Sequence, residues 1–243
     1  MSYRPIKSRL DRGGRVILDG PTGTELERRG VPMNEMAWCG LASLSHGEIL
    51  EQVHADYIAA GAAVVTVNTY ASSRLMLGAA GMEHEVARVV GAATAAAFRA
   101  RDRAAHGRPV AVAGSLSHMV PPRTHEAPAP SEAEMLAAFR ELAAALAASD
   151  CELILLEMMY DPKRMPLAIT AALETGLPVW LGLSARLGDA ARLLSHTEAR
   201  PIPFAEIVAL LPDAGIDVAG VMHTSATATD PPCMRSGRRF RDR

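Results

Sequence analysis

The sequence is poor in lysine and in cysteine. Only Lys7 and Lys163 occur among its 243 residues, and neither ends a predicted strand, which disfavours aldolase chemistry through a lysine Schiff base. The three cysteines, Cys39, Cys151 and Cys233, are odd in number and show no C-x-x-C spacing. This usage favours a reduced, cytoplasmic protein over a disulfide scaffold.

The chain also lacks a charge excess and a long hydrophobic run. Its formal net charge is −2, which leaves no basic footprint for nucleic acid or for an anionic membrane. No stretch approaches the roughly 20 apolar residues that span a bilayer. Residues 1–15 are charged and contain no apolar segment of a secretory signal. We therefore expect small-molecule ligands, with neither nucleic acid nor membrane as a partner.

Two nucleotide-binding motifs are missing as well. No G-x-G-x-x-G follows a predicted strand, which argues against a nicotinamide dinucleotide. The glycine-containing segment at residues 19–26 is not followed by Gly-Lys-Ser/Thr, and Pro21 removes a backbone donor from it. A phosphate-binding loop is therefore not expected there.

Six short runs rich in Val, Ile and Leu are present, and helix-length stretches separate them. The runs are residues 16–19, 64–68, 110–115, 153–157, 179–184 and 218–223. Their lack of alternation is typical of parallel strands buried on both faces. With 49% hydrophobic residues, the chain is long enough for one large core. The pattern predicts an α/β fold, a TIM-type (β/α)8 barrel, with an open doubly wound sheet as the alternative.

Capping signals mark several predicted helices. Ser45 to Glu48 and Ser131 to Glu134 match the capping-box pattern, and Asp161-Pro162 predicts the start of a helix that ends near Gly176. An alanine-rich helix is expected at residues 82–105 and a shorter helix at 204–211.

Each hydrophobic run ends at a small or polar residue. In order, these residues are Asp19, Asn68, Ser115, Glu157, Ser184 and His223. The carboxyl ends of barrel strands converge on the face that carries the active site. We therefore expect the six side chains to surround one pocket, and this expectation favours the barrel over the open sheet.

Two of these residues are carboxylates. Glu157 follows four aliphatic residues, where a charge is costly to bury without a partner, so a functional role is favoured. Asp19 and Glu157 could together hold an amino-acid ammonium group, or act as a general acid and base. Asp19 could equally serve only as the cap of the next helix. His223 has no second His or Cys at metal-ligand spacing.

The six predicted strands are two fewer than a closed barrel needs. We assign residues 14–224 to an incomplete barrel domain and residues 225–243 to an irregular basic tail. One interpretation of the tail is a disordered segment. The other is that truncation or a shifted reading frame has removed the last two βα units. Exposed apolar edges would then favour self-association into a homo-oligomer.

Together these motifs resemble the homocysteine S-methyltransferase family. Residues 18–26 are similar to its Asp-Gly-Gly-x-Gly-Thr-Glu-Leu motif, and residues 57–62 and 67–72 to its TNTY-x-AS region. Leu155 to Met158 matches the strand whose glutamate the family uses. Residues 220–223 stand where the family has Gly-x-Asn-Cys. The resemblance covers about residues 14–224.

The resemblance implies an S-methyltransferase that moves a methyl group from a sulfonium, betaine or folate to the homocysteine thiol, giving methionine. It implies zinc on three cysteines, which would present the substrate as a thiolate. Asp19, Gly20, Asn68 and Glu157 would bind substrate. His223 would be the catalytic and metal-site residue, although it replaces a cysteine.

The family's later Gly-Gly-Cys-Cys pair is absent from this chain, so we expect an incomplete zinc site. Two alternatives stay open. One is a zinc-free relative that binds an amino acid or thioether or serves as a partner subunit. The other is a barrel lyase or hydrolase that uses Asp19 and Glu157.

Overall fold

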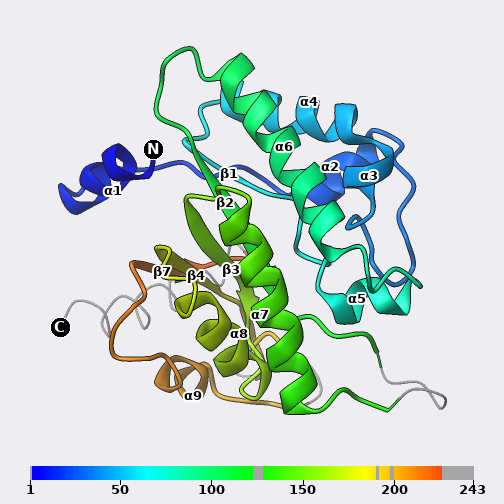
Figure 1. The fold of residues 1–243 in the computed structure, drawn as a ribbon. Helices are drawn as coiled ribbons and strands as arrows, with labels where there is room; N and C mark the ends of the chain where they lie inside the picture. The colour runs from blue at the N-terminus through cyan, green and yellow to red at the C-terminus, as the bar shows by residue number, and fades with distance from the viewer. Residues whose placement is uncertain (1, 123–127, 190–191, 198–199, 226–243) are drawn as a thin grey trace.

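A parallel sheet curved like half a barrel forms the centre of the computed structural model (Figure 1). The structure describes residues 2–122, 128–189, 192–197 and 200–225. All pairings within the sheet are parallel, in the order β1-β2-β3-β4-β7. The strands are β1 (Val64–Thr66), β2 (Ala111–Ser117), β3 (Leu153–Met159), β4 (Val179–Leu183) and β7 (Val218–Val221). A single parallel bridge from Leu18 to Val64 extends the sheet beyond β1.

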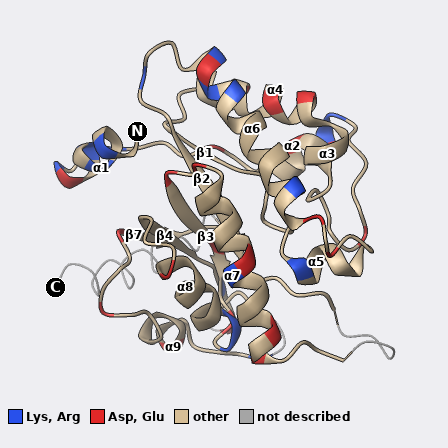
Figure 2. Ribbon diagram, in the orientation of Figure 1, with Lys and Arg blue, Asp and Glu red and all other residues tan. Residues whose placement is uncertain are grey.

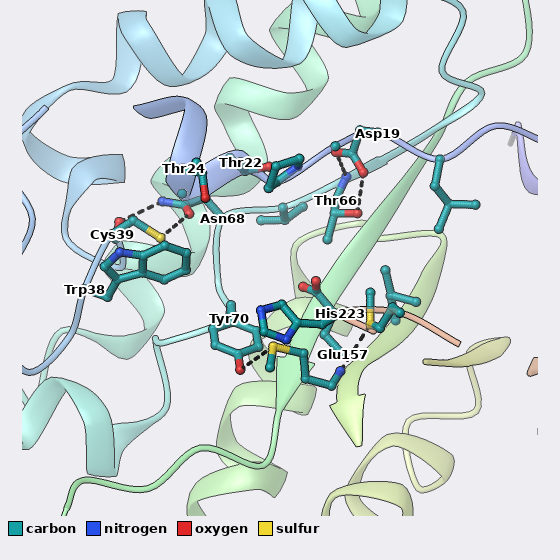
Figure 3. A pocket seen from close by; sticks show the side chains of 18 of the residues that line it. Asp19, Thr22, Thr24, Trp38, Cys39, Thr66, Asn68, Tyr70, Glu157 and His223 are labelled. Atoms are coloured by element: carbon teal, nitrogen blue, oxygen red, sulfur yellow. Dashed lines mark hydrogen bonds between the residues drawn. The ribbon is translucent and has the colours of Figure 1, made fainter. Parts of the chain in front are cut away.

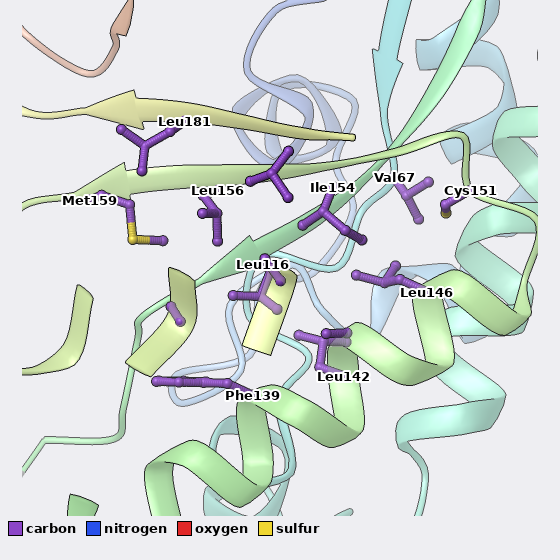
Figure 4. Close-up of a cluster of buried hydrophobic side chains, with 14 of the residues drawn as sticks. Val67, Leu116, Phe139, Leu142, Leu146, Cys151, Ile154, Leu156, Met159 and Leu181 are labelled. Carbon is purple, nitrogen blue, oxygen red and sulfur yellow. The ribbon is translucent and has the colours of Figure 1, made fainter. Parts of the chain in front are cut away.

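Helices cover the outer face of this sheet and bury the main core. They are α4 (Gly47–Ala59), α6 (Val86–Ala104), α7 (Glu132–Ala148), α8 (Arg164–Leu173) and α9 (Phe204–Ala209). Figure 4 shows Phe139 and Leu142 of α7 directed toward Leu116 and Leu156 of the sheet, and all four belong to one buried cluster. Basic and acidic residues both occur along the helices (Figure 2).

Apart from α1, which is described below, the remaining elements are short. They are α2 (Thr22–Arg28), α3 (Ala42–Ser45), α5 (Arg74–Ala79) and an antiparallel pair formed by β5 (Ala185–Leu187) and β6 (Leu193–Ser195). Within the described ranges, no helix is long and apolar enough to cross a membrane.

The inner face of the sheet is filled from one end by α1 (Tyr3–Asp11). Ile6 is 2% exposed and belongs to a cluster formed with inward-facing residues near the amino ends of the strands. Its sheet members are Val64, Ala111, Ala113, Leu153, Leu155 and Trp180. Tyr3 strengthens this closure, since it receives a hydrogen bond from Trp180 Nε1 at 3.2 Å and donates one to Asp217 at 3.0 Å. The carboxyl end of the sheet is thereby left for a site.

The alternation of side chains along each strand places polar residues at the carboxyl end of the inner face. On β3, Leu153, Leu155 and Glu157 share the inner face, whereas Ile154 and Leu156 pack against the helices. Successive strand residues point to opposite faces, so the third inward position falls above the two apolar layers. A polar side chain at this position faces an opening instead of the core.

Most of the predicted elements are found, with several differences. The run at residues 16–19 forms only the bridge at Leu18 and is not a regular strand. Ser131 and Glu134 form the predicted capping box, but the box predicted from Ser45 to Glu48 is wrong. There α4 begins at Gly47, and the Ser45 hydroxyl instead donates to the carbonyl of Leu41.

The helix predicted to start at Asp161-Pro162 begins later, since α8 starts at Arg164 and its N-cap is Lys163. Asp161 still supports this start, because its Oδ1 accepts from the backbone N–H groups of Lys163 and Arg164, each at 2.9 Å. Helix α1 and the β5–β6 pair had not been predicted. Apart from Ser225, the predicted basic tail lies outside the described residues.

A histidine buried in α4 yields a prediction about stability. His54 is fully buried, and neither ring nitrogen has a hydrogen-bond partner among the described residues. Burial disfavours the charged ring and lowers the pKa of His54 from 6.5 to about 4. The unfolded chain therefore takes up a proton first as the pH falls. Folding free energy is lost between pH 6.5 and 4 at about 1.4 kcal/mol per pH unit.

We expect His54→Leu to remove this loss. The variant should be at least as stable as the wild type at pH 7.5, and its advantage should grow as the pH falls to 4.5. Urea unfolding at several pH values measures the difference. An advantage that does not change with pH would contradict the assignment.

Candidate functional site

A cavity of about 620 Å³ opens at the carboxyl ends of the strands (Figure 3). Four of the six predicted strand-end residues line it: Asp19, Asn68, Glu157 and His223. Its other walls come from the loop after residue 19, from Trp38 and Cys39, and from three methionines. Those methionines are Met119, Met158 and Met222.

Asp19 is fixed by β1. Its Oδ2 accepts a hydrogen bond of 2.6 Å from the backbone N–H of Thr66, and its Oδ1 accepts one of 2.7 Å from the Thr66 hydroxyl. Although these bonds favour the carboxylate, desolvation outweighs them and raises the pKa of Asp19 to about 6. Asp19 is thus held by the sheet and is not the cap of α2, whose N-cap is Pro21.

Glu157 approaches the cavity from β3. Its Oε1 accepts a hydrogen bond from the Ser115 hydroxyl, which lies fully buried on β2. Desolvation is the main reason why the pKa of Glu157 rises to about 7, and the nearby charge of Asp19 raises it further. Because the two carboxylates oppose each other's ionisation, a cation bound between them would stabilise both charged forms.

Asn68 organises the wall of the cavity. Its Nδ2 donates to the carbonyl of Cys39 at 2.9 Å and to the Ser43 hydroxyl at 3.2 Å, while its Oδ1 accepts from Cys39 Sγ at 3.1 Å. Burial raises the pKa of Cys39 to about 12, so this residue stays a neutral thiol. The amide of Asn68 is therefore engaged with protein atoms.

Gly20 permits a close contact. A Cβ at this position would lie 2.7 Å from the hydroxyl oxygen of Tyr57 on α4, so only glycine fits there without rearrangement. The loop that carries Asp19 is thereby packed directly against α4.

Two predicted members of the ring do not reach the cavity. Ser115 stands behind Glu157, and Ser184 donates its hydroxyl to the carbonyl of Met222 at 2.9 Å. Both are fully buried. Their short side chains end within hydrogen-bonding reach of neighbouring strands, so they support the site without lining it.

His223 and Met158 enter the cavity because their backbones break the alternation. Their φ angles are +46° and +54°, in the left-handed region that side-chain-bearing residues rarely adopt. Regular alternation would direct both side chains to the helical layer, yet both line the cavity. His223 was predicted from the sequence, whereas Met158 was not, because a left-handed residue leaves no signal in a hydrophobic pattern.

An aromatic pair forms another wall that had not been predicted. The rings of Trp38 and Tyr70 meet edge to face, with centroids 6.3 Å apart, and the Tyr70 hydroxyl contacts Met158 Sδ at 3.1 Å. Tyr70 follows Asn68 within the motif at residues 67–72, which was the available clue. No metal-binding group of three His, Cys, Asp or Glu side chains is present in the described part of the chain.

The sequence is similar to those of known methyltransferases. The model of the homocysteine S-methyltransferase family matches residues 16–227. A homocysteine S-methyltransferase of Bacillus subtilis, YbgG, is 36% identical over 99 residues, which is 40% of this chain and 31% of that protein. The Escherichia coli enzyme of the same description is 29% identical over 117 residues, 46% of this chain and 38% of the relative. The matched regions thus span about a third of the length of these relatives.

A solved structure shows the fold. The metallated form of the homocysteine methyltransferase MmuM from Escherichia coli superposes with a TM-score of 0.71 at 20% identity. The match covers 98% of this chain and 83% of that one. It confirms the predicted TIM-barrel-type fold class, of which the described residues form a parallel half-barrel. The family model covers most of the sequence, and the chain therefore belongs to the homocysteine S-methyltransferase family.

Proposed function

We propose that the cavity binds the amino-acid methyl acceptor homocysteine, and that residues 14–224 are the acceptor-binding domain of an enzyme that forms methionine. The observation that carries this proposal is the pair of desolvated carboxylates, Asp19 and Glu157, which face one cavity. A free α-amino acid brings an ammonium group, and that group is the cation which would relieve their mutual repulsion. Membership of the family supports this choice of amino acid.

The wall formed by Trp38, Tyr70 and Met158 suits the sulfur-bearing end of the ligand. Thioethers and sulfonium groups are polarisable and bind well against aromatic rings and methionine side chains. With the ammonium group held at Asp19 and Glu157, this wall would receive the sulfur and the methyl group being transferred. A cationic sulfonium donor fits this lining better than an anionic folate, because cations are attracted to aromatic faces.

Zinc is implied by the family resemblance, and a relative's structure is described as metallated. The described residues do not fit a zinc site, because they place no second or third metal ligand beside His223. The role of these residues in the reaction is therefore to bind and orient the acceptor. Asp19 and Glu157 hold its ammonium group, while the hydrogen bonds from Thr66 and Ser115 keep the two carboxylates in position.

A second candidate function is the binding of an amino-acid thioether without methyl transfer. The three methionines around the cavity and the lack of a metal-binding group in the described ranges favour it. The two candidates differ in their preferred ligand. Methyl transfer requires L-homocysteine to bind productively, whereas a thioether-binding protein would prefer L-methionine and show no turnover with any donor.

Glu157→Gln tests the ammonium site. We expect the affinity for L-homocysteine to fall by about tenfold to a hundredfold, because a charged partner of the ammonium group is lost. Isothermal titration calorimetry measures this change. Glu141→Gln is the matched control, since Glu141 forms an ion pair with Arg74 outside the cavity. Unchanged affinity in Glu157→Gln would contradict the assignment.

The same variant should be more stable than the wild type above pH 7. The pKa of Glu157 is raised from 4.5 to about 7 in the folded protein, so the folded state binds its proton more tightly than the unfolded state. The resulting stability is lost as the pH rises from 4.5 to 7. Removing the charge should recover about 1–2 kcal/mol at pH 8 and nothing at pH 4.5, as thermal unfolding would show.

Ligand affinity should depend on pH with a defined sign. The ammonium group binds the ionised carboxylates, so affinity should fall as the pH drops through 7 and then through 6. Binding below pH 7 should also release protons, which calorimetry in buffers of different ionisation enthalpy detects. Affinity that rises on acidification would refute a site made of two carboxylates.

His223→Ala tests the predicted metal role. We expect the zinc content of the purified protein, measured by mass spectrometry, to be the same in this variant and in the wild type. A stoichiometric loss of zinc in the variant would show that His223 is a ligand after all.

A further inference from the structure

Three strained residues surround the cavity. Of the five non-glycine residues with positive φ in the described ranges, Trp38, Met158 and His223 line this one site. Left-handed backbone of this kind costs on the order of 1 kcal/mol per residue and persists where the surroundings enforce it. Its concentration around one cavity indicates that the positions of these three side chains matter to the ligand.

Trp38 has a φ of +44°, and hydrogen bonds hold the loop that carries it. The Asn34 side chain accepts hydrogen bonds from the backbone of Met36 and Ala37, and the Asn34 N–H donates to the Trp38 carbonyl at 2.9 Å. On the other side, Asn68 holds the carbonyl of Cys39. The loop is braced at both ends, so the backbone fixes the direction in which the Trp38 side chain leaves the chain.

The indole rests on a glycine of α2. A Cβ built on Gly23 would fall 2.5 Å from Cη2 of Trp38 and 2.7 Å from Cζ2. No side chain fits there while the ring keeps its place. Since the colliding atoms are the outer edge of a side chain, a methyl group at Gly23 would displace the ring and leave the backbone intact.

The ring itself is a large apolar surface turned to an opening. Trp38 is 36% exposed, and its ring borders the cavity beside Tyr70 (Figure 3). A bulky aromatic residue exposed in this manner is a favourable contact for the apolar or cationic end of a ligand.

We infer that Trp38 determines specificity for the sulfur-bearing end of the amino acid and that Gly23 is the positioning residue that seats its indole. This inference rests on the proposed function, because it takes the ligand to be an amino acid held at Asp19 and Glu157. It adds that the length and chemistry of the ligand's side chain are sensed at Trp38.

The test compares two glycine-to-alanine substitutions in helices. Gly23→Ala places a methyl group under the indole, while Gly91→Ala on α6 is the matched control, since a Cβ there has nothing within 4 Å. Alanine is the better helix former, so neither change is expected to unfold its helix. The chain has two tryptophans, so 5-fluorotryptophan labelling gives two fluorine resonances, with Trp180 as an internal reference.

Gly23→Ala should shift the Trp38 resonance and leave that of Trp180 in place, while Gly91→Ala should move neither. By calorimetry, Gly23→Ala should weaken L-methionine and S-methyl-L-methionine by about tenfold, as expected for a lost aromatic contact. It should change the affinity for the shorter L-2-aminobutyrate by less than about twofold, since that ligand keeps only the ammonium contacts. Adding Trp38→Phe should restore part of the selectivity, because the smaller ring clears the new methyl group.

Unchanged fluorine spectra in Gly23→Ala would show that Gly23 does not position the indole of Trp38. An equal loss of affinity for all three ligands would refute the specificity role of Trp38. If the wild type bound neither these three amino acids nor L-homocysteine, the proposed function would fail together with the specificity role of Trp38. The fluorine spectra would still decide whether Gly23 seats the indole.

Discussion

The placement of Asp19 and Glu157 in one desolvated cavity is the constraint on which the site depends. Burial raises the pKa of both carboxyl groups, and the nearby charge of Asp19 raises the pKa of Glu157 further. Hydrogen bonds from Thr66 and Ser115 recover part of this cost. The hydrogen bonds do not offset the whole cost of burying the two charges. A bound ammonium group would offset more of it, so the burial that destabilises the empty protein would favour binding of a cation.

The rest of the fold places these two groups on the wall of one cavity. The inner face of each strand begins with apolar residues, and α1 covers that end with Ile6. The third inward position of β3 is then Glu157, whose side chain meets the hydroxyl of Ser115 from the neighbouring strand. A shift of β3 by one residue would turn Glu157 toward the helices. The position of this carboxylate in the cavity therefore depends on the pairing register of β3.

The parallel sheet and the two carboxylates could be predicted because they follow from local rules. Hydrophobic runs of strand length, separated by capped helices, leave few alternatives to a parallel sheet, and polar residues at the strand ends then share one face. Five of the six runs are strands, and four of the six strand-end residues line the cavity. Ser115 and Ser184 were misplaced because a short side chain at a strand end is easily satisfied by the next strand.

What could not be predicted depends on backbone geometry and on distant contacts. Met158 and Trp38 reach the cavity through left-handed conformations, which no hydrophobic period reveals. The seat that Gly23 provides for the indole requires the loop at residues 34–39 to fold back over α2. Helix α1 closes the barrel interior through contacts with residues as distant as Asp217, and its charged sequence gave no sign of this role.

The proposed function depends on a Glu157 carboxyl group that stays partly protonated at neutral pH until a cation binds. Carbon-13 NMR of the glutamate side-chain carboxyl groups, with Glu157→Gln to assign the signal, measures this directly. We predict that Glu157 titrates near pH 7 in the free protein and well below pH 6 in the presence of saturating L-homocysteine. A Glu157 carboxyl that titrates near its usual value of 4.5 in the free protein, or that does not respond to the amino acid, would contradict the account.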